Sequence, residues 1–100
     1  MTDRDHREAA RRHIRTLISL LSSRALQDDL IRPLVDELES LERAVAAFHL
    51  EAIRFRMFNV DRLLSHSPVA IPDEVGHLFA DARHELEAAG FHTRSHQAPS

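Results

Sequence analysis

Residues 34–65 read LVDELESLERAVAAFHLEAIRFRMFNVDRLLS, a stretch that contains neither glycine nor proline. Its apolar positions are separated alternately by four and three residues, which is the spacing of a hydrophobic seam along one face of an α-helix. The seam consists of Leu34, Leu38, Leu41, Val45, Phe48, Ala52 and Phe55. Pro33 suits the first turn of a helix. The pattern predicts one long central helix over about residues 33–65, with a break at residues 48–50 as the alternative.

A shorter helix is expected before this stretch, over about residues 5–22. Its apolar residues recur at the intervals of a buried helical face: Ala10, Ile14, Leu17, Ile18 and Leu21. Ser22 and Ser23 are expected to end it, and Asp28 or Asp29 is expected to cap the segment that leads into Pro33.

A third helix is expected over about residues 72–89. Pro72 suits its start, and Asp73 and Glu74 place negative charge in the first turn, where the helix dipole favours it. Its apolar face consists of Val75, Leu78, Phe79, Ala82, Leu86 and Ala89. Gly90 is typical of the residue that follows a helix. No stretch shows the alternation of a β-strand, so the sequence predicts an all-α small helical bundle.

Length and composition indicate one folded domain. The chain has 100 residues, of which 43% are hydrophobic and 29% charged, as in ordinary globular domains. We expect a single domain over residues 1–91 and a flexible tail over residues 92–100. With no cysteine, disulfides and a cysteine nucleophile are excluded. The longest apolar run near the N-terminus, residues 17–21, is too short for a signal peptide or a membrane span, so a cytoplasmic protein is expected.

The charges are distributed unevenly, although the net charge is only −3. All basic side chains are arginines, and they concentrate in the first expected helix, whereas the first half of the central helix is acidic. The favoured interpretation is that these two helices pair within one chain. The alternative is a patch for nucleic acid or another anionic surface. It would consist of Arg4, Arg7, Arg11 and Arg15, which lie within an arc of about 80° on the helix.

Eight histidines raise the question of a divalent transition metal. The best local cluster is His77, Asp81 and His84, because the aspartate is four residues from one histidine and three from the other. This cluster is expected to lie opposite the apolar face of its helix, so a solvated polar face is the favoured interpretation.

Three polar residues, Glu42, His49 and Arg56, interrupt the central seam at intervals of seven. A second, antiparallel copy with a two-fold axis at His49 would place Glu42 of each chain opposite Arg56 of the other and Val45 opposite Ile53. Self-complementarity of this kind is what a two-fold interface requires. The predicted dimer interface is therefore Glu42, Val45, His49, Ile53 and Arg56. The alternative is that the two shorter helices cover the seam within one chain.

The central helix also carries apolar residues beyond one seam, including Leu50, Met57 and Phe58, which is typical of a helix buried on most sides. With only two short helices to cover it, association with a second copy or with another protein is expected. No phosphate-binding loop or catalytic triad is apparent, so no catalytic residue is assigned. The sequence favours a non-catalytic protein–protein interaction or oligomerisation module without a cofactor. Metal binding by histidines is the alternative, followed by nucleic-acid binding.

Overall fold

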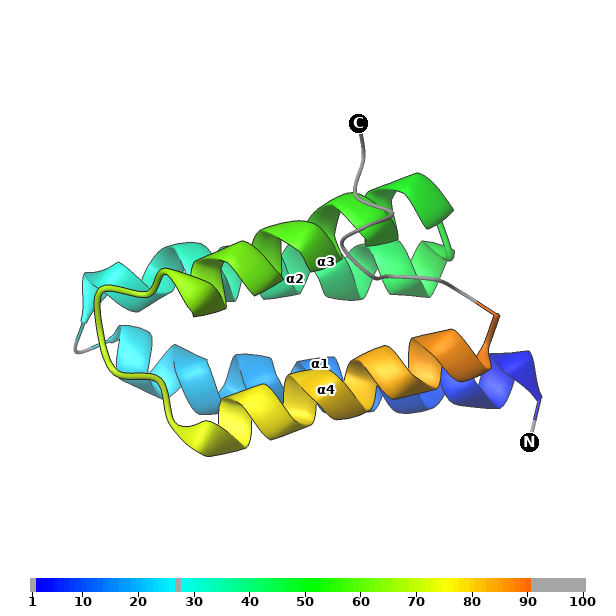
Figure 1. Cartoon of the computed structure of the whole chain (residues 1–100), viewed down its shortest axis with the longest axis horizontal. Helices are drawn as coiled ribbons and strands as arrows, with labels where there is room; N and C mark the ends of the chain where they lie inside the picture. Colours follow the sequence, from blue (N-terminus) through cyan, green and yellow to red (C-terminus); the bar gives the residue numbers. More distant parts are fainter. Residues whose placement is uncertain (1, 27, 91–100) are drawn as a thin grey trace.

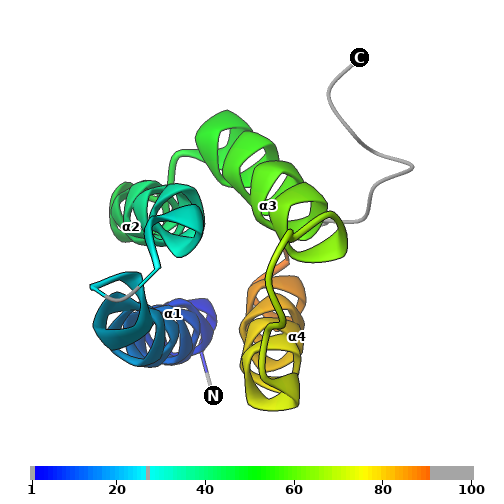
Figure 2. The same ribbon diagram turned by 90° about the vertical axis from the view of Figure 1, so that its left-hand side faces the viewer.

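The computed structural model of this chain describes residues 2–26 and 28–90. These residues form helices and no strand: α1 (Asp3–Ala25), a 3-10 turn η1 (Asp29–Ile31), α2 (Arg32–Ala47), α3 (Leu50–Ser65) and α4 (Asp73–Ala88). Successive helices run in opposite directions (Figure 1). Seen end-on, α1 packs against both α2 and α4, and α2 packs against α3 (Figure 2). The predicted all-α helical bundle is confirmed.

The prediction of one uninterrupted central helix is wrong, because the chain reverses at Phe48 and His49. Phe48 has φ 49° and ψ 46°, which is the left-handed region. Its N–H donates to the Val45 carbonyl at 3.0 Å, and the His49 N–H donates to the Ala44 carbonyl at 3.0 Å. These two bonds define a Schellman motif, which ends a helix and redirects the chain. The break at residues 48–50 was the alternative, and it is the one observed.

The sequence favoured a continuous helix over this reversal because a left-handed position usually holds glycine. A side chain with a Cβ costs about 1–2 kcal/mol there. Phe48 offsets this cost through packing, since its ring lies against the core and the Arg7 guanidinium of α1 lies 4.4 Å from the ring centroid. Tertiary contacts therefore hold a turn that the local sequence does not favour.

The N-terminus of α1 is fixed by a capping box. The Asp5 N–H donates to the Thr2 hydroxyl, and the Thr2 N–H donates to the Asp5 carboxylate, each at 3.1 Å. The bond from the Thr2 N–H, with that from the Thr2 hydroxyl, holds the pKa of Asp5 below its usual value. At the other end, α1 continues past the predicted end at Ser22 to Ala25, because Ala25 is buried in the core.

The remaining helix ends follow the sequence closely. The Asp28 carboxylate accepts a hydrogen bond from the Leu30 N–H at 3.0 Å, as expected for a cap. In α4, Asp73 and Glu74 occupy the first turn, and Gly90 follows the helix with φ 91°. Glycine adopts a left-handed conformation at this point without steric cost, because it has no Cβ. The predicted tail, residues 92–100, lies outside the described residues.

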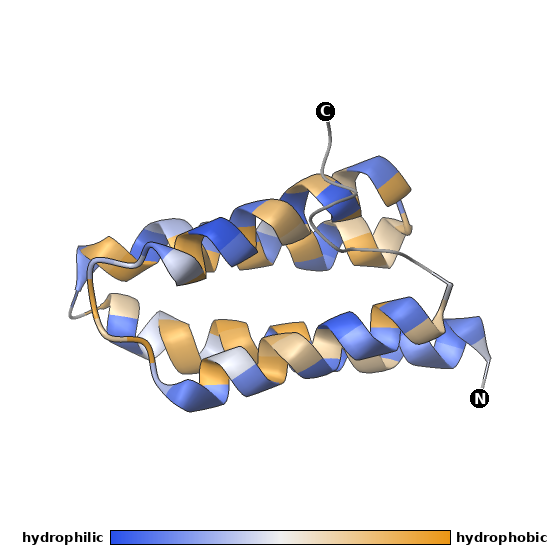
Figure 3. Ribbon diagram, viewed as in Figure 1, coloured by the Kyte–Doolittle hydropathy of each residue, from blue (hydrophilic) through white to orange (hydrophobic). Residues whose placement is uncertain are grey.

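The core is formed by the inward faces of all four helices, along which hydrophobic residues recur (Figure 3). Its largest fully buried side chains are Ile14, Leu17, Leu21, Val35, Leu38, Leu41, Val45, Ile53, Met57, Val60, Val75 and Leu86. They form one continuous cluster. The apolar faces predicted for the first and third helices therefore lie against the central residues 33–65, folded back as α2 and α3.

Candidate functional site

The residues of the predicted two-fold seam lie inside and around the core of a single chain. Val45 and Ile53 are fully buried in the cluster that all four helices form. His49 is exposed and precedes α3. The straight helix on which that interface depended does not exist, so its two-fold geometry is wrong. The chain reverses at Phe48 and His49, so α2 and α3 pack against each other within one chain, and Arg56 contacts Glu37 instead of Glu42.

Glu42 joins α2 to α1. Its Oε1 accepts hydrogen bonds from Arg11 Nη2 at 3.1 Å and from Arg15 Nε at 3.0 Å. Burial of the Glu42 carboxyl acts to raise its pKa, but the hydrogen bonds and charges of Arg11 and Arg15 outweigh burial and hold the pKa below its usual value. The predicted pairing of the arginine-rich first helix with the acidic half of the central stretch is confirmed by these contacts.

A Glu42→Gln variant is expected to lose about 1 kcal/mol of stability at neutral pH, since it removes the charge that two arginines contact. A carboxyl whose pKa is lowered in the folded state stabilises the fold fully at pH values above its unfolded-state pKa, near 4.5. This stabilisation is lost as the pH falls through the folded-state pKa. Urea unfolding of both proteins between pH 7 and pH 3 should show their stabilities converging in acid. A difference that stays constant across this range would contradict the ionic role of Glu42.

Three further polar contacts join neighbouring helices. His6 Nδ1 lies 2.9 Å from Glu85 Oε2 between α1 and α4. Arg56 Nη1 donates to Glu37 Oε1 at 2.8 Å between α2 and α3. Arg83 Nη2 donates to Asp61 Oδ2 at 2.5 Å between α3 and α4. These contacts engage Arg56 of the predicted interface within its own chain, and each joins two neighbouring helices.

The predicted anion-binding stripe on α1 is largely engaged in internal contacts. Arg11 and Arg15 bind Glu42, and Arg7 covers the ring of Phe48. Only Arg4, at the exposed start of α1, has no contact of this kind to another helix in the described part of the chain. Nucleic-acid binding by α1 stays a prediction, and its patch contains fewer available guanidinium groups than the sequence indicated.

The predicted metal cluster lies on the exposed face of α4. His77, Asp81 and His84 are all exposed, as the favoured interpretation of a solvated face requires. His84 Nδ1 lies 3.8 Å from Glu87 Oε1. Among residues 2–26 and 28–90, no group of three or more His, Asp or Glu side chains is arranged to hold a metal ion. Metal binding stays a prediction.

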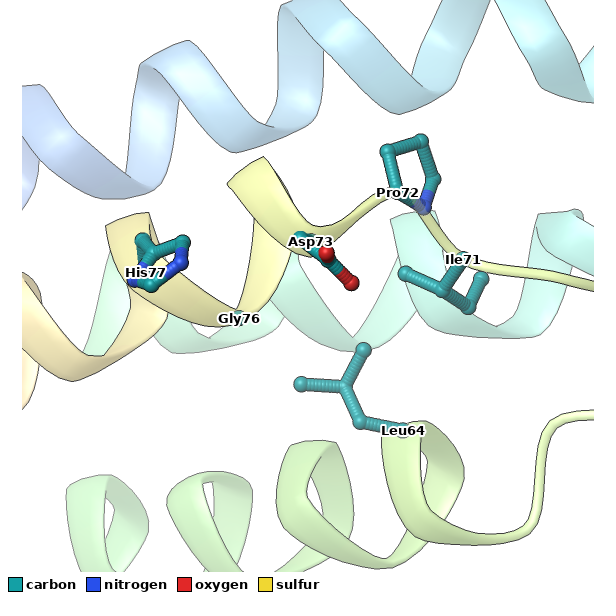
Figure 4. A pocket seen from close by; sticks show the side chains of 6 residues that line it. All are labelled: Leu64, Ile71, Pro72, Asp73, Gly76 and His77. Carbon is teal, nitrogen blue, oxygen red and sulfur yellow. The ribbon is translucent and has the colours of Figure 1, made fainter.

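A hollow of about 460 Å³ lies where the end of α3 meets the start of α4 (Figure 4). Leu64, Ile71 and Pro72 form its apolar wall, and Asp73 and His77 border it from α4. Gly76 also lines the hollow, and apart from its chain neighbours and its own helix backbone, no atom lies within 4 Å of the position that a Cβ would take there. The hollow is an open surface depression with mixed walls.

The outer face of α3 carries an exposed row of side chains that we call the α3 outer stripe: Glu51, Phe55, Phe58 and Arg62. At 100° per residue these four positions fall within about 60° of one another. Phe55 is 47% exposed and Phe58 38%; Leu50, at the start of the helix and outside this arc, is 48% exposed. The Arg56 guanidinium lies 5.2 Å from the centroid of the Phe55 ring. Among the described residues, α3 carries more exposed large hydrophobic side chains than any other helix.

Sequence reasoning assigned Phe55 to the buried seam, which is wrong. The reversal at Phe48 changes the phase of the following helix, so that Ile53, Met57 and Val60 face the core and Phe55 faces outward. The surplus of apolar residues beyond one seam was the signal for an additional surface. Phe58 belongs to that surface, Leu50 is exposed outside it, and Met57 is fully buried.

No protein-family model, curated protein or solved structure matches this chain. The structure itself therefore defines the class of protein: among the described residues it is a four-helix bundle whose third helix, α3, exposes two phenylalanines to solvent. In residues 2–26 and 28–90, no helix combines the length and the apolar character that crossing a membrane requires.

Proposed function

We propose that this chain is a non-catalytic protein–protein interaction or oligomerisation module, of the kind used as a small regulator, adaptor or accessory subunit. The observation that carries the proposal is the α3 outer stripe. Two phenylalanines on one helix face leave apolar surface in water on a helix whose other face is already buried. With no cysteine in the chain, the cytoplasm is the proposed location.

The composition of the stripe is that of an interface centre. Aromatic residues and arginine are enriched at the centres of protein interfaces, where they supply most of the binding energy. Phe55 and Phe58 are flanked by Arg56 and Arg62, while the acidic Glu51 lies at the other end. Association is favoured when a partner covers the rings, since each square ångström of apolar area removed from water stabilises the complex by roughly 25 cal/mol.

The proposal predicts that association depends on the two phenylalanines. Sedimentation equilibrium of the wild type should show reversible self-association, and a Phe55→Ser/Phe58→Ser variant should sediment as a monomer. Because both rings project outward, the variant is expected to retain the helical circular dichroism of the wild type. A Leu26→Ser variant is the matched control, since Leu26 is an exposed apolar residue at the end of α1. It should associate as the wild type does.

A wild-type protein that stays monomeric at high micromolar concentration would contradict the oligomerisation module. Equal association of the wild type and the double variant would contradict the assignment of the interface to α3.

A further inference from the structure

We infer that the partner of the α3 outer stripe is a second copy of this chain, whose own stripe lies antiparallel against the first. The inference rests on the proposed function and specifies its partner. Its basis is the order of side chains along the stripe, which is acid, aromatic, aromatic, base, at intervals of four, three and four residues. When one stripe is turned end to end against another, each acid lies opposite a base and each aromatic ring lies opposite an aromatic ring.

A two-fold axis that crosses α3 between positions 56 and 57 brings the two stripes together. Phe55 of each chain then lies opposite the partner's Phe58, and Glu51 lies opposite the partner's Arg62. Every contact occurs twice, as in all interfaces with two-fold symmetry. The stripe extends about 16 Å along the helix, which is a suitable length for two antiparallel helices packed side by side.

The charged ends of the stripe are available for these contacts. Arg62 is exposed and makes no ion pair within the described residues. The Glu51 side chain is 76% exposed and contacts Arg54 on the same helix at 3.1 Å. An exposed pair one turn apart contributes little, so Glu51 is free to contact a second cation.

The same charges disfavour a parallel arrangement. Two parallel stripes in register would place Glu51 against Glu51 and Arg62 against Arg62, and like charges at an interface are repulsive. Other exposed apolar residues lack this complementarity. Leu26 and Leu30, at the opposite end of the bundle from the start of α3, are not arranged in a row with paired charges. The order of charges along α3 therefore selects an antiparallel second copy.

A charge-reversal cycle tests the pairing. Glu51→Arg places Arg against the partner's Arg62 twice, and the dimer dissociation constant should rise at least about tenfold. The double variant Glu51→Arg/Arg62→Glu restores opposite charges and should return the constant to near the wild-type value. Glu39→Arg, the same change at an exposed position of α2, should leave it nearly unchanged. A single variant that weakens the dimer without rescue by the double variant would overturn the pairing.

Cross-linking tests the direction of the helices, and the absence of native cysteine makes it simple. A mixture of Glu51→Cys and Arg62→Cys chains should form a disulfide between the two kinds of chain, because positions 51 and 62 lie opposite each other. Neither variant alone should cross-link with itself, because like positions are then about 16 Å apart along the helix. Self-cross-linking of either variant would overturn the antiparallel geometry.

The two proposals fail differently. A wild-type dimer that is insensitive to Glu51→Arg, or that self-cross-links at position 51, refutes the antiparallel stripe while the oligomerisation module stands. A wild-type monomer refutes both.

Discussion

An Ile53→Asp variant is expected to unfold the protein. Ile53 is fully buried in the hydrophobic cluster where all four helices meet. The members of this cluster are all hydrophobic, so none of them can pair with a carboxylate. A carboxylate placed there loses its hydration and gains no partner, at a cost of several kcal/mol. Domains of this size have total stabilities of roughly 5–15 kcal/mol, so most of the folded state is lost. Far-ultraviolet circular dichroism and urea titration measure the loss of helix directly.

Ile53→Val is the matched control, because it keeps the site apolar and costs only about 0.5–1.5 kcal/mol. The comparison also separates two interpretations of the same residue. If Ile53 lay in an interface between two straight helices, as the sequence suggested, Ile53→Asp would release a folded monomer. A helical, monomeric Ile53→Asp protein would therefore contradict the bundle described here.

An Asp61→Ala variant is expected to lose about 2 kcal/mol of stability. The Arg83 side chain is only 13% exposed, and its guanidinium donates to Asp61 across the boundary between α3 and α4. Its Nε is already buried without a hydrogen-bond partner among the described residues. Removal of the carboxylate leaves a largely buried cation without its counter-ion, which costs more than the pair contributes when intact. The exposure of Asp61 itself keeps the effect below that of a fully buried pair.

Urea unfolding checks this value, with Asp81→Ala as the control. Asp81 is an exposed aspartate on α4, and its replacement should change the stability by less than about 0.5 kcal/mol. Replacement of both charged partners, Asp61→Ala/Arg83→Met, should recover part of the loss, because no cation then remains unpaired. Equal stability of Asp61→Ala and the wild type would show that the Asp61 carboxylate does not stabilise the Arg83 guanidinium.

The elements that the sequence predicted well are those with both periodicity and punctuation. α1 and α4 each have a clear apolar face, and Pro72 and Gly90 mark the ends of α4. The pairing of α1 with α2 followed from the charge distribution alone, although the shared acceptor Glu42 did not. Where local propensity and tertiary structure agree, the sequence is sufficient.

At the Phe48 reversal, local propensity and tertiary structure disagree. Ala46 and Ala47 favour continuation of the helix, and phenylalanine is not typical of a left-handed position. The pattern around His49 is also ambiguous in principle. An antiparallel dimer of straight helices and an antiparallel hairpin within one chain bring the same residues opposite each other, so self-complementarity cannot distinguish them. The position of the exposed stripe depends on this reversal, which is why the sequence placed Phe55 in the core.

The most direct test of these assignments is an isotope-filtered nuclear Overhauser experiment on an equal mixture of labelled and unlabelled chains. It detects only contacts between different copies. We expect cross-peaks between the rings of Phe55 and Phe58, and none that involve the methyl groups of Val45 or Ile53. Cross-peaks from Val45 or Ile53 to another chain, or the absence of any between the two phenylalanines, would contradict a self-contained bundle that dimerises through α3.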